Sequence, residues 1–224
     1  MVSPAKSSSS GKRDAATQEN IERAKEYIIK AIYSKNNDVI TKIITGGFPV
    51  DEPLVDHSKQ SMLMFCCKLK DTESHVDTLK VILASNPKIN LQDSNGRTAL
   101  HFACRAGRHD LIKELVKVKG IDVNRRTCGG ETPLMSAAQS GNIFTVGECL
   151  NNNFNPFLEN SLRMTARDYA QYFPKVYGHS LVSVFDTAIE QWKTQIPEAQ
   201  LKRMITNPNK YFDSYCPANK DSLQ

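Results

Sequence analysis

The sequence of 224 residues predicts an all-α fold, in which antiparallel helix pairs joined by short hairpin-like loops stack into a solenoid. Three observations lead to this prediction. One pattern occurs twice at constant spacing near the middle of the chain. Apolar residues recur every three or four positions over most of its length, which is the spacing of a helix with one buried face. No apolar run approaches the roughly 18 residues of a membrane span, so the composition favours a soluble, folded chain.

The repeated pattern lies between residues 93 and 141. The first copy, DSNGRTALHFA, occupies 93–103, and the second, TCGGETPLMSA, occupies 127–137. The glycine, threonine, leucine and final alanine of the first copy each recur 34 positions later, as does Gly107, which becomes Gly141. Matched positions at one spacing indicate a repeated structural unit.

This pattern resembles the ankyrin repeat, whose period is about 33 residues and whose signature is T-P-L-H-x-A. Thr98 and Thr132 can cap the helix that follows each of them, and Pro133 stands in a first turn, where a missing N–H is harmless. The glycines suit turns that need a positive φ. The resemblance implies that His101, in the signature histidine position, hydrogen-bonds the backbone and steadies the turn.

The N-terminal part is expected to hold a disordered tail over 1–16 and the start of an ankyrin-repeat domain over 17–193. The tail is rich in serine and nearly free of large apolar side chains. A plain solvated terminus and a docking or phosphorylation segment both remain open. The first unit, about 20–52, has a helix from Asn20 and a second at 37–45 but no signature entry, as an N-terminal cap should.

The next three units follow at about 53–89, 93–126 and 127–159. In the first of them Lys59 replaces the turn glycine, and the loop between its helices is about four residues too long. Its outer helix is expected over 75–83. The outer helix of the following unit is expected over 108–118.

The fifth unit, about 160–192, is expected to close the array as an irregular C-terminal cap. Arg163 stands in its glycine position, the turn at 172–179 is about four residues too long, and a last helix is predicted over 180–192. Residues 194–224 then form an extension with a short helix from Pro197. Its aromatic residues pack either on the last helix or on a partner, and both alternatives remain open. They are Tyr211, Phe212 and Tyr215.

The sequence has no phosphate-cradling, dinucleotide-binding, zinc-protease or nucleophile-elbow motif, and its five histidines are dispersed over different units. We therefore expect no enzyme, no cofactor and no metal. Cys66, Cys104 and Cys149 fall where the repeat has Ala or Leu, which predicts small buried groups and a reducing compartment. Because no signal segment is seen, we expect a cytoplasmic protein, with a nuclear or cytoskeletal location left open.

The resemblance implies that the concave side, formed by hairpin tips and inner helices, binds another protein. Twelve positions on this side are the candidate contacts: Lys68, Ser94, Asn95, Arg97, Arg105, Arg125, Arg126, Glu131, Gln139, Leu162, Met164 and Tyr172. Five of them are basic and one is acidic, so we expect the side to be positive in the middle and to dock an acidic partner segment. Leu162, Met164 and Tyr172 form an apolar end of this side.

Several alternatives remain open. The arginines could be a solvated surface with the contact elsewhere, because exposed charges often contribute little. The chain could instead be a constitutive structural subunit of a large protein assembly. Nucleic-acid binding is less supported, because the basic residues lack interleaved stacking aromatics. A small-molecule substrate or a membrane is not expected.

Overall fold

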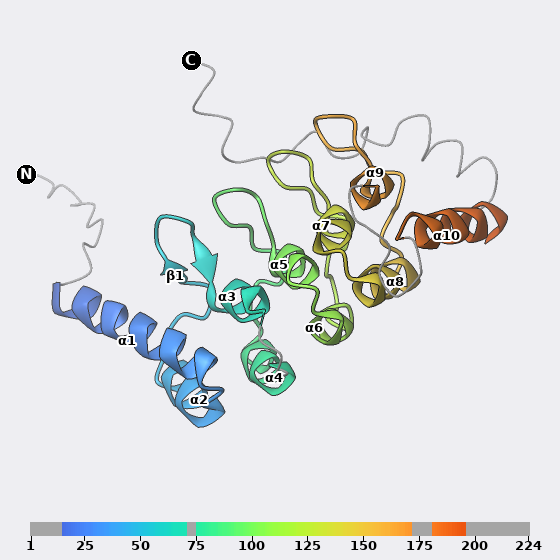
Figure 1. Ribbon diagram of the computed structural model, residues 1–224. Helices are drawn as coiled ribbons and strands as arrows, with labels where there is room; N and C mark the ends of the chain where they lie inside the picture. Colours follow the sequence, from blue (N-terminus) through green and yellow to red (C-terminus); the bar gives the residue numbers. More distant parts are fainter. Residues whose placement is uncertain (1–14, 71–74, 172–180, 196–224) are drawn as a thin grey trace, which may run out of the picture.

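The computed structural model describes residues 15–70, 75–171 and 181–195. Within these ranges the chain forms ten helices and two short strands, which confirms the all-α solenoid (Figure 1). The odd-numbered helices up to α9 are α1 (Ala15–Tyr33), α3 (Met62–Lys68), α5 (Ala99–Arg105), α7 (Pro133–Ser140) and α9 (Ala166–Ala170). The even-numbered helices are α2 (Asn37–Thr45), α4 (Val76–Ala84), α6 (His109–Leu115), α8 (Ile143–Asn151) and α10 (Leu181–Gln195).

The helices lie in two rows that follow the order of the sequence. The odd-numbered helices form an inner row, in which α3 packs on α5, α5 on α7 and α7 on α9. The even-numbered helices form an outer row, in which α2 contacts α4, α4 contacts α6, α6 contacts α8 and α8 contacts α10. Figure 1 shows the connecting loops between the units projecting together on one side of the inner row. Each unit therefore touches mainly the unit before it and the unit after it.

A short hairpin tip precedes each inner helix from α3 onward. In the first tip, β1 (Pro53–Val55) pairs antiparallel with β2 (Gln60–Ser61). Each later tip is closed by a backbone hydrogen bond between residues four positions apart. These bonds run from Asp93 N to Arg97 O (2.9 Å), from Thr127 N to Glu131 O (2.9 Å) and from Asn160 N to Met164 O (3.0 Å).

The inner helices begin at the predicted capping residues. Thr98 and Thr132 are the N-caps of α5 and α7, and Pro133 occupies the first helical turn. The Thr132 hydroxyl oxygen accepts a hydrogen bond from Met135 N (3.3 Å), which satisfies one of the amides that a helix start leaves without a partner. Thr165 caps α9 in the same way.

Positive φ angles occur where the repeat has its turn glycine. Gly96 and Gly130 both have a φ of 77°, as predicted. Lys59 and Arg163, which stand at the same position in other units, adopt φ values of 52° and 62°. The backbone of the tip thus keeps its conformation when the glycine is absent.

The core runs along the whole array between the two rows of helices. Cys66, Cys104 and Cys149 are fully buried and free, as predicted. Burial raises the pKa of the Cys66 thiol to about 12, so this group is neutral and serves as packing. None of the helices in the described ranges is long and apolar enough to cross a membrane.

Three boundaries differ from the predictions by more than one residue. Helix α1 begins at Ala15, inside the predicted tail, because Ala15, Ala16 and the residues after them favour helix. Helix α6 ends at Leu115 rather than at 118, because Val118 N bonds to Leu115 O in a turn. Helix α10 continues to Gln195. The remaining tail, the turn at 172–179 and the extension from Pro197 lie outside the described residues.

Replacement of Gly130 by Ala should destabilise the fold through crowding as well as backbone strain. A Cβ at this position would lie 2.6 Å from Arg126 Nη2 and 3.1 Å from Ser161 N of the next tip. We expect Gly130→Ala to lower the free energy of unfolding by about 2–4 kcal/mol. Gly120→Ala is the matched control, because Gly120 also has a positive φ but open space around it. Gly120→Ala should lower the free energy of unfolding by only about 1 kcal/mol when both variants are compared in urea titrations. Equal losses in the two variants would contradict a contribution from crowding at Gly130.

Candidate functional site

The candidate site is the side of the inner row that carries the tips, here called the tip face. It comprises tip residues 57–60, 94–97, 128–131 and 161–164, together with the exposed Lys68 and Arg105 and the half-buried Gln139 near the ends of the inner helices. Backbone hydrogen bonds of 3.0 Å join each tip to the one before it. They run from Ser94 N to Ser58 O, from Cys128 N to Asn95 O and from Ser161 N to Gly129 O. The tips therefore form a continuous surface of fixed spacing.

Arg97 is held in place by its own tip. Its guanidinium pairs with the Asp93 carboxylate (2.8 Å), whose side chain is fully buried. It also stacks over the Phe102 ring at 4.7 Å from the centroid. Asp93 further accepts hydrogen bonds from Asn95 N and Arg97 N, so this ion pair is part of the turn. Much of the Arg97 charge is thus compensated within the fold.

Arg125 and Arg126 also serve the contact between units. Arg125 donates to Gln92 Oε1 (3.1 Å) and lies 3.9 Å from an Asp122 oxygen. Arg126 donates to the Gly130 carbonyl (3.0 Å) and to the Glu159 carbonyl of the next unit. Both are only partly exposed. Both side chains thus connect the segments that enter successive tips.

Glu131 is the centre of a polar network on the tip face. Its Oε1 accepts a hydrogen bond from Gln139 Nε2 (3.1 Å) and another from the Tyr169 hydroxyl (2.8 Å). The Tyr169 oxygen in turn accepts one from Asn160 Nδ2 (2.9 Å). Burial, together with the nearby Glu131 carboxylate, raises the pKa of Tyr169. This network ties two successive units together.

Lys68 and Arg105 differ from the other cations of this face. They occupy equivalent positions near the C-terminal ends of α3 and α5, which pack directly against each other. Among the residues that the structure describes, Lys68 Nζ donates only to the neutral amide oxygen of Gln60 (3.4 Å). Arg105 is exposed and forms no hydrogen bond or ion pair among the described residues. Together they place two weakly compensated positive charges on neighbouring units.

The other candidate residues are spread along the same face. Ser94 and Asn95 are exposed at their tip. Leu162 is 75% exposed, and Met164 is half-buried beside it. Tyr172 lies outside the described residues. The predicted partner contact of all these residues stays a prediction.

The sequence analysis did not identify the residues that hold the basic side chains. Gln92 and Glu159 occupy the position of Arg126 in the units before and after it. Gln92 donates to the Arg126 carbonyl, and the Glu159 carbonyl accepts from the Arg126 guanidinium. Tyr169 stands where earlier units have Ser136 and Phe102. Alignment of the units by their period could have flagged these positions. It could not have shown which side chains they contact.

His101 has the backbone role that the family resemblance implied. Its Nδ1 accepts a hydrogen bond from Thr98 N (3.1 Å), so Nε2 carries the proton and donates to the Glu131 carbonyl (3.1 Å). Burial lowers the pKa of His101 to about 4. The ring is therefore neutral at pH 7 and links α5 to the next tip.

His101 should make the fold sensitive to mild acid. Its pKa is about 4 in the folded chain, against an ordinary 6.5, so the unfolded chain binds the proton more tightly. Stability from this group is complete above pH 6.5 and is lost as the pH falls toward 4, by up to about 3 kcal/mol. In urea titrations from pH 7 to pH 4.5, His101→Asn should flatten this decline. The exposed His109 provides the control variant His109→Asn, which should leave the slope unchanged.

In the described ranges, no group of three or more His, Cys, Asp or Glu side chains could hold a metal ion. The side chains of the tip face offer hydrogen bonding, charge and apolar contact. These are the means by which one protein recognises another.

Comparison with known proteins assigns the fold to a family. The family model for ankyrin repeats, in three copies, matches residues 27–127 and 63–160, which together make up more than half of the chain. The human photoreceptor ankyrin repeat protein is 44% identical over 59 residues, which are 26% of this chain and 13% of that protein. Human M-phase phosphoprotein 8 is 39% identical over 82 residues, or 35% of this chain and 9% of that protein.

A third relative is the human ankyrin repeat domain-containing protein 63, which is 30% identical over 95 residues. The match covers 41% of this chain and 25% of that protein. The chain therefore spans a quarter or less of the length of each of these three relatives. Repeats of this kind generally mediate protein–protein interaction and are typically not enzymes. With the family model matching over half of its length, this chain belongs to the ankyrin repeat family.

Proposed function

We propose that this chain is a non-catalytic adaptor or scaffold that binds an acidic segment of another protein on its tip face. The observation that carries the proposal is Arg105, an exposed cation with no ion pair among the described residues, next to Lys68 on the adjacent inner helix. A carboxylate that reaches both would meet two donors with little internal competition. Charge-assisted hydrogen bonds of this type are among the stronger contacts between proteins.

The partners that the other cations already have within the fold reduce what these cations can contribute to binding. Arg97 already has the Asp93 carboxylate, and Arg126 already has two carbonyl oxygens. A partner would have to share these groups or displace them. Arg105 and Lys68 give up no internal ion pair, so most of the electrostatic gain on binding should come from them.

The spacing of the two cations sets the shape of the partner segment. Helices packed side by side lie about 8–10 Å apart. A chain in the extended polyproline II conformation has three residues per turn and rises about 3.1 Å per residue, so two acidic side chains three residues apart would lie on one face and span the same distance. The exposed Ser94 and Asn95 can bond its backbone, and Leu162 and Met164 offer an apolar contact at the far end.

We also propose a cytoplasmic location. Four of the six cysteines, Cys66, Cys67, Cys104 and Cys149, are buried and free, which is usual for proteins of reducing compartments, whereas Cys128 forms a disulfide. Fractionation of cells that make the full chain tests this assignment directly.

Charge reversal at Arg105 should abolish recognition of acidic segments. In selection from a display library of random peptides, the wild-type chain should enrich extended peptides with two carboxylates three residues apart. Arg105→Glu should weaken binding of a selected peptide at least about tenfold, because an attraction becomes a repulsion. Lys42→Glu is the matched control, since it makes the same charge change on the exposed side of α2. It should bind as the wild type does.

Two results would refute the proposal. One is the selection of peptides with no excess of Asp or Glu. The other is a selected peptide that binds Arg105→Glu as tightly as the wild type. A DNA or RNA oligonucleotide bound more tightly than the peptides, with an affinity that falls steeply between two salt concentrations, would show phosphate contacts instead.

A further inference from the structure

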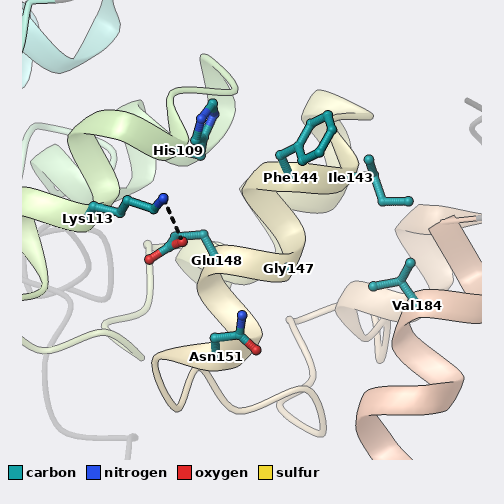
Figure 2. Close-up of a pocket in the computed structure, with 8 residues that line it drawn as sticks. All are labelled: His109, Lys113, Ile143, Phe144, Gly147, Glu148, Asn151 and Val184. Atoms are coloured by element: carbon teal, nitrogen blue, oxygen red, sulfur yellow. Dashed lines mark ion pairs between the residues drawn. The ribbon is translucent and has the colours of Figure 1, made fainter. Parts of the chain in front are cut away.

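A groove runs over the outer row of helices, on the side away from the tips. It encloses about 640 Å³ between α6, α8 and α10. Figure 2 shows Phe144 and Gly147 on α8, with His109 and Lys113 of α6 on one side and Val184 of α10 on the other. A second hollow between α8 and α10 shares Gly147 and Val184 and continues the groove along α8.

The repeat itself shows which residue this surface would be expected to carry. In α2, α4 and α6 the second residue after the N-cap is aspartate, namely Asp38, Asp77 and Asp110. An acidic residue there is favourable, because it meets the positive end of the helix dipole. In α8 the same position holds Phe144, and the first turn has no acidic residue.

The position one turn later shows a second departure. The residue at this position is Thr41 in α2, Lys80 in α4 and Lys113 in α6, but Gly147 in α8. Glycine is a poor residue for a helix interior, and a Cβ at Gly147 would meet no heavy atom within 4 Å. Packing among the described residues therefore does not require a glycine there.

Phe144 is likewise not absorbed by the core. It is 65% exposed, and its ring lies 6.2 Å from the exposed His109 ring, centroid to centroid. A large exposed side chain and a missing one thus stand on one face of α8, three residues apart. Residues at this spacing are neighbours on a helix surface. Phe144 therefore projects from α8 directly beside the hollow that Gly147 leaves.

We propose that this face of α8 binds a second copy of the chain across a two-fold axis. In an antiparallel arrangement, Phe144 of each copy enters the hollow over Gly147 of the other, and the absent side chains let the two helices approach closely. A two-fold interface must be self-complementary, and this one surface supplies both the projection and the hollow.

The charges beside the groove fit the same arrangement. Lys113 Nζ lies 3.7 Å from Glu148 Oε2, and the Lys113 side chain is 54% exposed. One rim thus carries both signs of charge. When the surface meets its own copy, Lys113 can face Glu148 of the second copy without repulsion between like charges.

The dimer would leave the tip face open. The tips project from the inner row, whereas the groove lies on the outer row (Figure 1). Each dimer would present two tip faces, so a partner with two acidic segments could bind both at once. The dimer does not depend on what the tip face binds.

The test is sedimentation velocity on the full chain over about a hundredfold range of concentration. The wild type should shift from monomer to dimer as the concentration rises. Phe144→Asp and Gly147→Lys each restore a residue that other units of this chain carry, and both replacements suit a helix. Each should weaken association at least about tenfold, without a fall in melting temperature.

Arg105→Glu serves as the control for surface charge and should dimerise as the wild type does. A wild type that stays monomeric throughout would overturn the proposal. So would dimers of unchanged affinity in both folded variants. Growth beyond the dimer would exclude the closed two-fold pairing, because head-to-tail contacts continue to add copies.

Discussion

The stacking of each tip on the one before it is the contact on which the rest of the structure depends. A backbone amide of one tip donates to a carbonyl of its neighbour at 3.0 Å, and this bond recurs three times along the array. Because both groups belong to the backbone, this bond sets the spacing of the units whatever side chains the tips carry. The capping threonines, the inner helices and the buried cysteines then follow at fixed distances from the tip. Side chains can vary only at positions that do not take part in this stacking.

Within a tip, a short polar side chain holds the turn against its neighbours. Asp93 and Asn160 each accept two backbone amides of their own tip, and Thr127 accepts one. The glycine at the next step of the turn is needed most where another tip lies close, as at Gly96, whose added Cβ would be 2.7 Å from Cys128 N. Arg163 occupies the glycine position of the last described tip and still adopts a positive φ. Close contact with the following tip explains Gly96 and Gly130, whereas Lys59 and Arg163 reach a positive φ with a side chain in the first and last of these tips.

The period of the sequence predicted the helices, their caps and the turn conformations, because all of these are local or recur at a constant spacing. Thr98, Thr132, Gly96 and Cys104 could be assigned in this way. The partners of the basic side chains could not. Arg125 contacts Gln92 across 33 positions, and Arg126 reaches the Glu159 carbonyl across the same separation. A repeat pattern gives the position of a residue on a unit, but not which of several polar neighbours its side chain selects.

A repeat protein offers its own reference for judging unusual residues, since every unit must solve the same packing problem. Cys66 and Cys104 replace the signature alanine or a neighbouring small residue, and the core buries them completely. These departures are explained inside the chain. Phe144 departs from three aspartates and remains 65% exposed, while Gly147 removes a side chain that nothing nearby crowds. Among the described residues, neither helix propensity nor burial accounts for them, which supports the proposed contact with a second copy of the chain.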